Sequence, residues 1–542
     1  MGHSDSHQRQ LNIVDNFSIV KNNHQFKLGI DYRKLLPSIS AQPYTEEVQT
    51  TPDLAALGLV QMIEIRSRLG EVYPRYTNFS VYGQDSWKIS ERLSLNYGLR
   101  WELNPSPTEK YGNMPYSLTG LDNPRTIALG TRASRLWETS YTDFAPRFGF
   151  TYLVNSSNGK ETLIKGGVGV FYDLGMAMAG ASLGGEGFPY SSVKRFFEVP
   201  WPLSPTDAAP RSPNLDPPYG YIGVMDPKLR SPKTYQWSGG LTQAIGNNQA
   251  LTVTYVGAAG RQLKSSHFFQ NPNPNFFTVE RVGNHGFSDY HALQAQFQRR
   301  LVKNLQVLAS YTWSHSIDTA SQDFYDRQFT DDQINLTDDK GNSDFDVRHT
   351  FSSGVTYEVP DFVPGKVSGW IFRNWSVDTK FFARTSMPMK VYGCCNFGFY
   401  RPDIKEGFPI RISDPNEPDG WRLNWQAFAP ATAPRQGTLG RNVIRGFPAV
   451  QLDLSLRRTF AVNERVKINL IADSFNILNH PNFADPFNII FGEFFDELIF
   501  GKTNQMLAAS MGVQTSSGST GFNEIYQVGG PRNIQFAIKI EF

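Results

Sequence analysis

Polar and apolar residues alternate at the end of the chain. Ile534, Phe536, Ile538, Ile540 and Phe542 are apolar, whereas the residues between them are polar or small. A period of two residues indicates a β-strand with one apolar face and one polar face. Such a strand fits a soluble sandwich as well as a membrane barrel, so its meaning depends on the rest of the chain.

The same alternation recurs along the sequence, in paired segments joined by short turns rich in Asn, Gly, Ser and Lys. Turns of this composition are typical of β-hairpins. The segments are about 10–14 residues long, close to the length that a tilted strand needs to cross a bilayer and longer than most soluble strands. The predicted strands are 11–20 with 24–35, 75–90 with 93–103, 143–154 with 161–174, 234–245 with 249–263, 290–301 with 304–317, 349–360 with 374–386, 450–462 with 465–478, and 534–542 alone.

The connections between these pairs are long, roughly 25 to 60 residues, and rich in Pro, Gly, Asp and aromatic residues. Short turns at one end and long loops at the other are typical of outer-membrane barrels, whose turns face the periplasm and whose loops face the exterior. A sandwich or a propeller would not place every long loop on alternate connections. The sequence therefore predicts an all-β fold, a transmembrane antiparallel up-and-down β-barrel with about 15 strands.

Segment 93–103 shows how the two faces of a predicted strand differ. Leu99 and Trp101 lie on the apolar face, and Arg100 and Glu102 lie on the other face. Because a charged side chain in the middle of a bilayer costs about 2–4 kcal/mol, we expect Arg100 and Glu102 to face the lumen. Tryptophans near the strand ends suit the aromatic belts found at membrane interfaces. They are Trp87, Trp101, Trp237, Trp313 and Trp375.

Composition excludes several other classes. The 542 residues carry a net charge of only +2, which gives no case for a nucleic-acid partner. Aromatic residues make up 13% and charged residues 19% of the chain, as expected if much of its surface faces lipid. No apolar run approaches the length of a transmembrane helix, and the first residues lack the basic and apolar regions of a signal peptide. The adjacent Cys394 and Cys395 are too few ligands for a structural zinc site and are interpreted as a loop pair without a catalytic role.

One loop carries a group of acidic residues that offers a weak candidate for a calcium site. Carboxylates are the ligands that Ca²⁺ prefers, but their spacing here does not match an EF-hand, and a solvated acidic surface is the commoner explanation. The six residues are Asp331, Asp332, Asp338, Asp339, Asp344 and Asp346. Asp346 also lies close to Arg348 and His349, which suggests acid–base chemistry, although a salt-bridged rim of the barrel explains the same residues. We find no catalytic motif and no cofactor motif, so an enzyme is not expected.

Several stretches resemble TonB-dependent outer-membrane receptors, and in particular the Oar-like group of that family. They are "FSVYGQDSWKISERLSLNYGLRWE", "APRFGFTY", "SDFDVRHTFSSGVTYEVP", "VKINLIADSFNILNHPNF" and the final strand ending in Phe542. The resemblance implies a 22-stranded barrel with a plug in its lumen. It also implies location in the cell outer membrane, contact with the TonB complex, and recognition of residues 534–542 by the barrel-assembly machinery.

The resemblance covers only the barrel, so residues 1–542 are expected to be a partial barrel domain without plug or signal peptide. The corresponding function is TonB-energised uptake of a scarce nutrient, and the fragment alone is not expected to be active. An adhesion or surface-display protein and a passive porin remain the alternatives. Because about 15 strands leave the first and last running in the same direction, we expect an incomplete, C-shaped wall. Its free edges should be the strands near Ile13–Val20 and Ile534–Phe542, and the latter should pair only with Val466–Asn476.

Overall fold

A computed structural model of the chain describes most of its residues. The described ranges are 6–39, 44–68, 70–173, 182–183, 188–209, 216–321, 328–329, 339–360, 373–393, 401–431, 436–463, 465–490, 497–503, 505–507, 514–515, 518–519 and 529–542. Within these ranges no helix is both long enough and apolar enough to cross a membrane.

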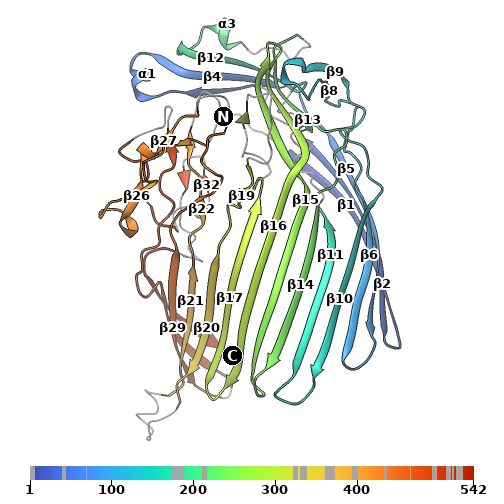
Figure 1. The fold of residues 1–542 in the computed structure, drawn as a ribbon, viewed down its shortest axis with the longest axis vertical. Helices are drawn as coiled ribbons and strands as arrows, with labels where there is room; N and C mark the ends of the chain where they lie inside the picture. Colours follow the sequence, from blue (N-terminus) through green and yellow to red (C-terminus); the bar gives the residue numbers. More distant parts are fainter. Residues whose placement is uncertain are drawn as a thin grey trace.

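Fifteen strands form one continuous antiparallel wall in chain order (Figure 1). Each hairpin predicted from the alternating segments is present, and each hairpin also pairs with the next one along the chain. The strands, each paired with the one that follows it, are β1 (Ser6–Lys21), β2 (His24–Ile39), β5 (Pro74–Lys88), β6 (Leu93–Leu103), β10 (Asp143–Asn155), β11 (Thr162–Tyr172), β14 (Lys233–Ala244), β15 (Gln249–Asn273), β16 (Phe276–Val302), β17 (Leu305–Asp318), β20 (His349–Glu358), β21 (Trp375–Arg384), β29 (Ala449–Ala461), β30 (Lys467–Phe475) and β34 (Asn533–Glu541).

The short turns lie together at one end of the wall, and the long connections lie at the other end (Figure 1). The turn between β16 and β17 shows why the sequence favours such hairpins. Lys303 and Asn304 have φ angles of 49° and 63°. A two-residue turn with positive φ at both positions matches the right-handed twist of the strands that it joins.

The last strand confirms the predicted pairing at the edge of the wall. β34 pairs with β30, with Ile538 opposite Leu470. β1 pairs with β2, and among the described residues no pairing joins β1 to β34. Since every step along the wall is antiparallel, β1 and β34 run in the same direction, and the wall stays open between them.

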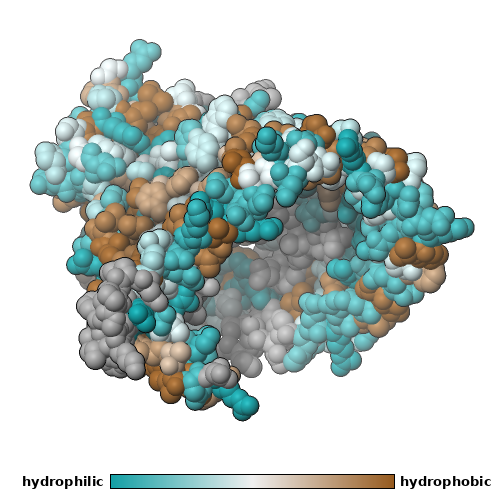
Figure 2. All heavy atoms as spheres, turned by 90° about the horizontal axis from the view of Figure 1, so that it is seen from below, coloured by the Kyte–Doolittle hydropathy of each residue, from teal (hydrophilic) through white to brown (hydrophobic). Residues whose placement is uncertain are grey.

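The apolar faces of the strands are the exposed ones. Ile534, Phe536 and Ile538 are 56%, 82% and 72% exposed. In β6, Leu99 is 49% exposed whereas Glu102 is buried. Figure 2 views the molecule from the end with the short turns and shows the wall curving around a hollow. This distribution fits a wall whose apolar face is solvated by lipid.

The long connections are not the featureless loops that their composition suggests. β15 and β16 continue well past the neighbouring strands, and β13 (Tyr219–Met225) adds to β16 in parallel. A separate sheet above the wall orders β12 (Ser191–Pro200), β4 (Leu59–Arg68) and β3 (Tyr44–Gln49), with short helices α1 (Pro52–Ala56) and α3 (Pro205–Ala208) beside it. The other elements in this region are β7 (Thr108–Glu109), β8 (Tyr116–Thr119), η1 (Pro124–Thr126), β9 (Ala128–Arg132), β18 (Gln328–Phe329) and β19 (Gly341–Asn342).

The connection between β21 and β29 folds into a compact unit, which we call the loop module (388–393, 401–431 and 436–445). Its strands are only two or three residues long, so its stability must come mostly from its apolar core. That core contains Met389, Val391, Leu423, Ala427, Phe428, Leu439 and Ile444, with Ile490 and Phe500 from the following connection. Its elements are β22 (Pro388–Met389), β23 (Tyr392–Gly393), β24 (Asp403–Ile404), β25 (Arg411–Ser413), η3 (Pro418–Gly420), β26 (Trp421–Leu423), η4 (Trp425–Ala427), β27 (Phe428–Ala429) and β28 (Ile444–Arg445). Farther along the chain lie β31 (Ile489–Ile490), β32 (Gln514–Thr515) and β33 (Gly518–Ser519).

Candidate ligand site at the loop end of the barrel

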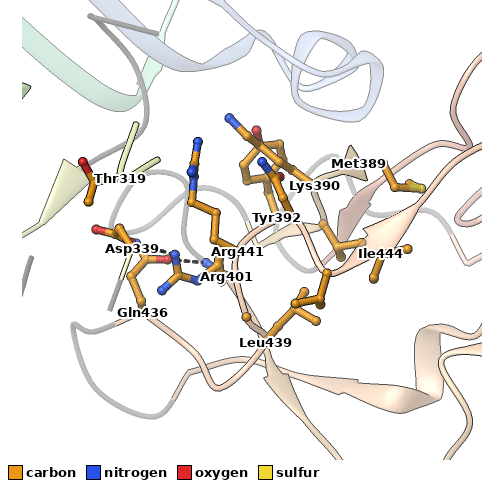
Figure 3. A pocket seen from close by; sticks show the side chains of 14 residues that line it. Thr319, Asp339, Met389, Lys390, Tyr392, Arg401, Gln436, Leu439, Arg441 and Ile444 are labelled. Carbon is orange, nitrogen blue, oxygen red and sulfur yellow. Dashed lines mark hydrogen bonds and ion pairs between the residues drawn. The ribbon is translucent and has the colours of Figure 1, made fainter. Parts of the chain in front are cut away.

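A pocket lies where the loop module meets the end of β17 (Figure 3). Part of its lining is apolar and comes from the core of the loop module, namely Met389, Val391, Leu439 and Ile444. The rest of its lining is polar and includes Thr319, Asp339, Lys390, Tyr392, Arg401, Gln436 and Arg441. The pocket is therefore amphipathic, with three cationic side chains and one carboxylate around it.

The chain fits closely around the turn that carries Arg441. A Cβ atom at Gly341 would lie 2.5 Å from the carbonyl oxygen of Arg441, so only glycine fits in this strand. The next residue, Asn442, has a φ of 56°, a conformation that asparagine tolerates better than most residues. Its side-chain amide donates to the carbonyl oxygen of Asn342 at 2.7 Å. β19 thus holds the turn and directs the side chain of Arg441 toward the wall.

Arg441 forms the most deeply buried ion pair of the site. Its guanidinium bonds Asp318 at the end of β17, and the two side chains are 5% and 2% exposed. It also donates to the hydroxyl of Ser321 at 2.9 Å and lies 3.6 Å from Asp344. A buried guanidinium needs such partners, because an unpaired buried charge is strongly destabilising.

Asp344 connects the turn of the loop module to the pocket wall. Its carboxylate accepts from Nζ of Lys390 at 2.9 Å and from the amide of Asn442 at 2.7 Å. Asp339 forms a similar pair with Arg401, at 2.6 Å. The backbone N–H of Arg401 in turn donates to Gln436 at 2.8 Å. Each cation of the pocket therefore has a carboxylate partner, and the ion pairs link the loop module to neighbouring segments.

Asp346 completes this set of ion pairs beneath the start of β20. Its side chain is fully buried, accepts from the backbone N–H of Ser316 at 2.7 Å, and pairs with Arg348 at 3.3 Å and with Arg445. Nδ1 of His315 lies 3.1 Å from the same carboxylate. Burial acts to raise the pKa of Asp346, but the bonds from Ser316, His315 and Arg445 outweigh it and hold the pKa below its usual value.

These contacts decide what the acidic loop residues do. Asp339, Asp344 and Asp346 each bond an arginine or lysine side chain instead of converging on one point. Within the described ranges no group of three or more possible metal ligands is found. Asp331, Asp332 and Asp338, like Cys394 and Cys395, lie outside the described residues, so the calcium site stays a prediction. The salt-bridged explanation of Asp346 and Arg348 is confirmed.

The charged residues of β6 form their own chain of ion pairs. Nε of Arg100 donates to Glu102 at 3.0 Å, and its Nη2 lies 3.7 Å from Asp31 on β2. Arg100 lines a hollow of the wall together with Gln84 and Arg147. Leu99 extends from the opposite, exposed face. The assignment of Arg100 and Glu102 to the lumen stays a prediction, as does the role of Ile534, Phe536, Ile538, Ile540 and Phe542 in assembly.

The sequence did not indicate the cationic side of the pocket. Lys390, Arg401, Arg441 and Arg445 occur in a connection without periodicity, and their partners are up to 123 residues away in the chain. The only available signal was the density of aspartates in "SDFDVRH", since buried carboxylates need cationic partners. That signal predicts that arginines or lysines lie nearby but does not say which ones.

Comparison with known proteins identifies the class. Residues 2–535 match the model of the family described as outer membrane beta barrel domain. The chain therefore belongs to that family, and it is an outer-membrane protein with an antiparallel β-barrel fold. No curated protein sequence matches it significantly.

Solved structures show the same fold at low sequence identity. The outer membrane transporter YddB from Escherichia coli superimposes with a TM-score of 0.51 at 11% identity, over 99% of this chain and 53% of that one. The copper transporter OprC gives 0.47 at 12%, over 99% and 57%. The ferric-catecholate import receptor Fiu from E. coli K12 gives 0.46 at 10%, over 99% and 55%. The chain thus spans about half the length of the structures that it matches.

Proposed function

We propose that this chain is the barrel portion of an outer-membrane receptor that imports a scarce nutrient with energy from the TonB complex. The observation that carries the proposal is the pocket between the loop module and β17. It combines an apolar surface with hydrogen-bond donors, and buried ion pairs hold its walls. Ligand sites are typically apolar pockets with a few fixed polar groups, and here such a pocket lies at the end of a barrel.

The proposal includes parts beyond the described wall. A barrel of this width leaks unless its lumen is filled, so uptake requires a plug and further strands that close the wall. Contact with TonB would be made through those parts. The face of β34 that carries Ile534 and Phe536 would meet the barrel-assembly machinery first and membrane lipid afterwards. The substrate is not specified by the pocket beyond its amphipathic character, and no role as an enzyme is proposed.

A second candidate function is adhesion or surface display. It is favoured by the sheet of β3, β4 and β12 above the wall, where Phe197 and Trp201 are 64% and 51% exposed. Exposed aromatic side chains at the outer end of a barrel are suited to contact with sugars or peptides. In this case the barrel would serve as an anchor. A passive porin is the third alternative, and the loop module at the mouth makes it the least favoured.

Growth under nutrient limitation tests the proposal. Deletion of the gene in the cells of origin should cause a growth defect when one particular nutrient is scarce, and deletion of tonB should cause the same defect. The intact gene should restore growth, and the double variant R401Q/R441Q should not do so at equal surface level. R135Q, which changes an exposed arginine elsewhere, is the matched control and should restore growth. Normal growth on every limiting nutrient would favour surface display, and a defect independent of tonB would favour a porin.

A further inference from the structure

Three of the nine histidines lie on adjacent strands at the loop end of the wall. His291 on β16 faces His315 on β17 in register, and His349 is the first residue of β20. On these strands the same face carries Leu293 and Trp313, which are 41% and 54% exposed. We call these three residues the histidine row. By alternation the row belongs to the outward, apolar face of the wall.

Two members of the row form the same hydrogen bond with a tyrosine on a neighbouring strand. The hydroxyl of Tyr255 lies 2.7 Å from Nδ1 of His291, and that of Tyr311 lies 2.7 Å from Nδ1 of His349. The rings of each couple are almost parallel, with angles of 21° and 22° between their planes. Because the tyrosine occupies Nδ1, it fixes the orientation of the imidazole and leaves the Nε2 edge for another partner.

The third member differs, because it links the row to the ion pairs described above. Nδ1 of His315 lies 3.1 Å from the buried carboxylate of Asp346, and its Nε2 lies 3.2 Å from the guanidinium of Arg348. This contact places Arg348 beside His315, with 37% of its side chain exposed. The row therefore includes a partly exposed guanidinium as well as imidazoles.

Further cations lie at the same level of the wall on the preceding strands. Lys233 and Arg261 face each other across β14 and β15, and Arg261 pairs with Asp289 at 2.7 Å. Nζ of Lys233 lies 5.6 Å from the ring of Tyr235 on the same face. Since Asp346 is buried, the exposed charges along this stretch are Lys233, Arg261 and Arg348 against Asp289. The exposed surface is thus cationic.

The depth of this stretch follows from the aromatic side chains around it. Tyrosine and tryptophan concentrate at the boundary between hydrocarbon and head groups. Tyr255, Trp313 and Tyr235 are all between 39% and 54% exposed on the same face as the row. Below them, toward the short turns, the face is aliphatic and includes Leu241 and Leu251. The histidine row therefore lies at the level of the lipid head groups on the loop side of the membrane.

We propose that the histidine row, together with Lys233, Arg261 and Arg348, binds the phosphate group of an anionic lipid head group in the outer leaflet. Imidazole and guanidinium N–H groups donate strong hydrogen bonds to phosphate oxygens. The site faces sideways into the membrane and continues the lipid-facing band, so a lipid reaches it by lateral diffusion. The exposed positive charge complements a phosphate and not a zwitterionic head group alone.

Retention of lipids on the purified full chain tests this proposal. The detergent-solubilised protein is incubated with mixed micelles containing equal amounts of phosphatidic acid and phosphatidylcholine, and the bound lipids are counted by native mass spectrometry. The wild type should retain phosphatidic acid over phosphatidylcholine by about threefold or more, as a few exposed charge-assisted contacts would give. Inorganic phosphate at the same concentration should not displace it, which separates a lipid site from a site for free phosphate.

Variants locate the site and keep the test independent of folding. H291Q/H349Q preserves a hydrogen-bonding partner for both tyrosines and should abolish the preference, whereas H291R/H349R should retain or increase it. H480Q makes the same chemical change at a histidine outside the row and should behave as the wild type. No preference in the wild type, an unchanged preference in H291Q/H349Q, or displacement by inorganic phosphate would each overturn the proposal.

Discussion

The guanidinium of Arg441 and the carboxylate of Asp318 form an ion pair that is almost completely removed from solvent. Their side chains are 5% and 2% exposed, and the residues are 123 positions apart in the chain. Asp318 ends a strand of the barrel wall, whereas Arg441 belongs to the loop module. One contact thus joins the two parts of the molecule that form the pocket.

Removal of one partner of this pair should loosen the loop module. R441Q leaves the carboxylate of Asp318 buried without its cation, and such a change typically costs about 3–5 kcal/mol. Hydrogen exchange of the loop-module amides would report the loss as faster local opening, with the wall strands unaffected.

An exposed ion pair provides the control for that experiment. Arg135 and Glu138 lie 3.9 Å apart with side chains 63% and 52% exposed. R135Q should change local stability by no more than about 1 kcal/mol, because solvent screens such pairs. Equal effects of R441Q and R135Q would show that burial of the Arg441 pair contributes nothing.

Glu280 should make the extension of β15 and β16 sensitive to pH. Its side chain is completely buried beside the hydroxyl of Tyr221, and burial raises its pKa from 4.5 to about 7. The folded state therefore binds this proton more tightly than the unfolded state does. The resulting stabilisation is fully present below pH 4.5 and is lost as the pH rises through about 7. The difference in pKa corresponds to ~3 kcal/mol as an upper estimate.

Substitution of Glu280 by glutamine isolates this effect. E280Q keeps the shape but has no proton to lose, so local stability of the extension should no longer fall between pH 5 and 8, a range that spans its pKa of about 7. E138Q, at an exposed glutamate, should leave the pH dependence of the wild type intact. Hydrogen exchange at a series of pH values, corrected for the intrinsic exchange rate, measures both variants. A fall in stability with rising pH that persists in E280Q would assign the effect to another group.

The wall strands were predictable because their two faces have different surroundings. In β6 and β34, lipid on one side and the lumen on the other impose a period of two that the sequence displays. The extension of β15 and β16 was missed because both of its faces are buried, with Val279 on one and Glu280 on the other. Its bulges, such as the one between Gly260 and Leu263, also interrupt the alternation.

Cysteine labelling should establish the register of β6. Leu99 is 49% exposed on the apolar face, and Arg100 forms its ion pairs on the other face. L99C should react with a lipid-soluble probe, and R100C should react with a water-soluble probe added to the lumen side. A slip of one residue would exchange the two results. Equal labelling of both positions by both probes would contradict the predicted faces.

Deletion of Phe542 should impair insertion into the outer membrane. β34 ends at Glu541, and the side chain of Phe542 is 95% exposed, so its removal takes almost no packing from the wall. A lower outer-membrane level of the full-length protein would therefore report on recognition by the assembly machinery and not on stability. K539A, on the opposite face of β34, is the control and should insert normally. A normal level after the deletion would rule out this role.

The pocket was less predictable than the wall for a physical reason. The partners Lys390 and Asp344, or Arg401 and Asp339, meet only after a connection without periodicity has folded around its apolar core. Local sequence determines neither the path of that connection nor which charges become buried. The density of aspartates near β20 indicated that cations would be required, and it incorrectly suggested that a metal ion was an alternative for Asp344 and Asp346.

The shared direction of β1 and β34 sets an arithmetic condition on whatever completes the wall. Antiparallel pairing at both edges requires that an odd number of strands fill the gap, since each added strand reverses the direction. A β-hairpin always contributes an even number, so no set of complete hairpins can close the ring. At least one strand of the missing arc must therefore enter without a hairpin partner beside it.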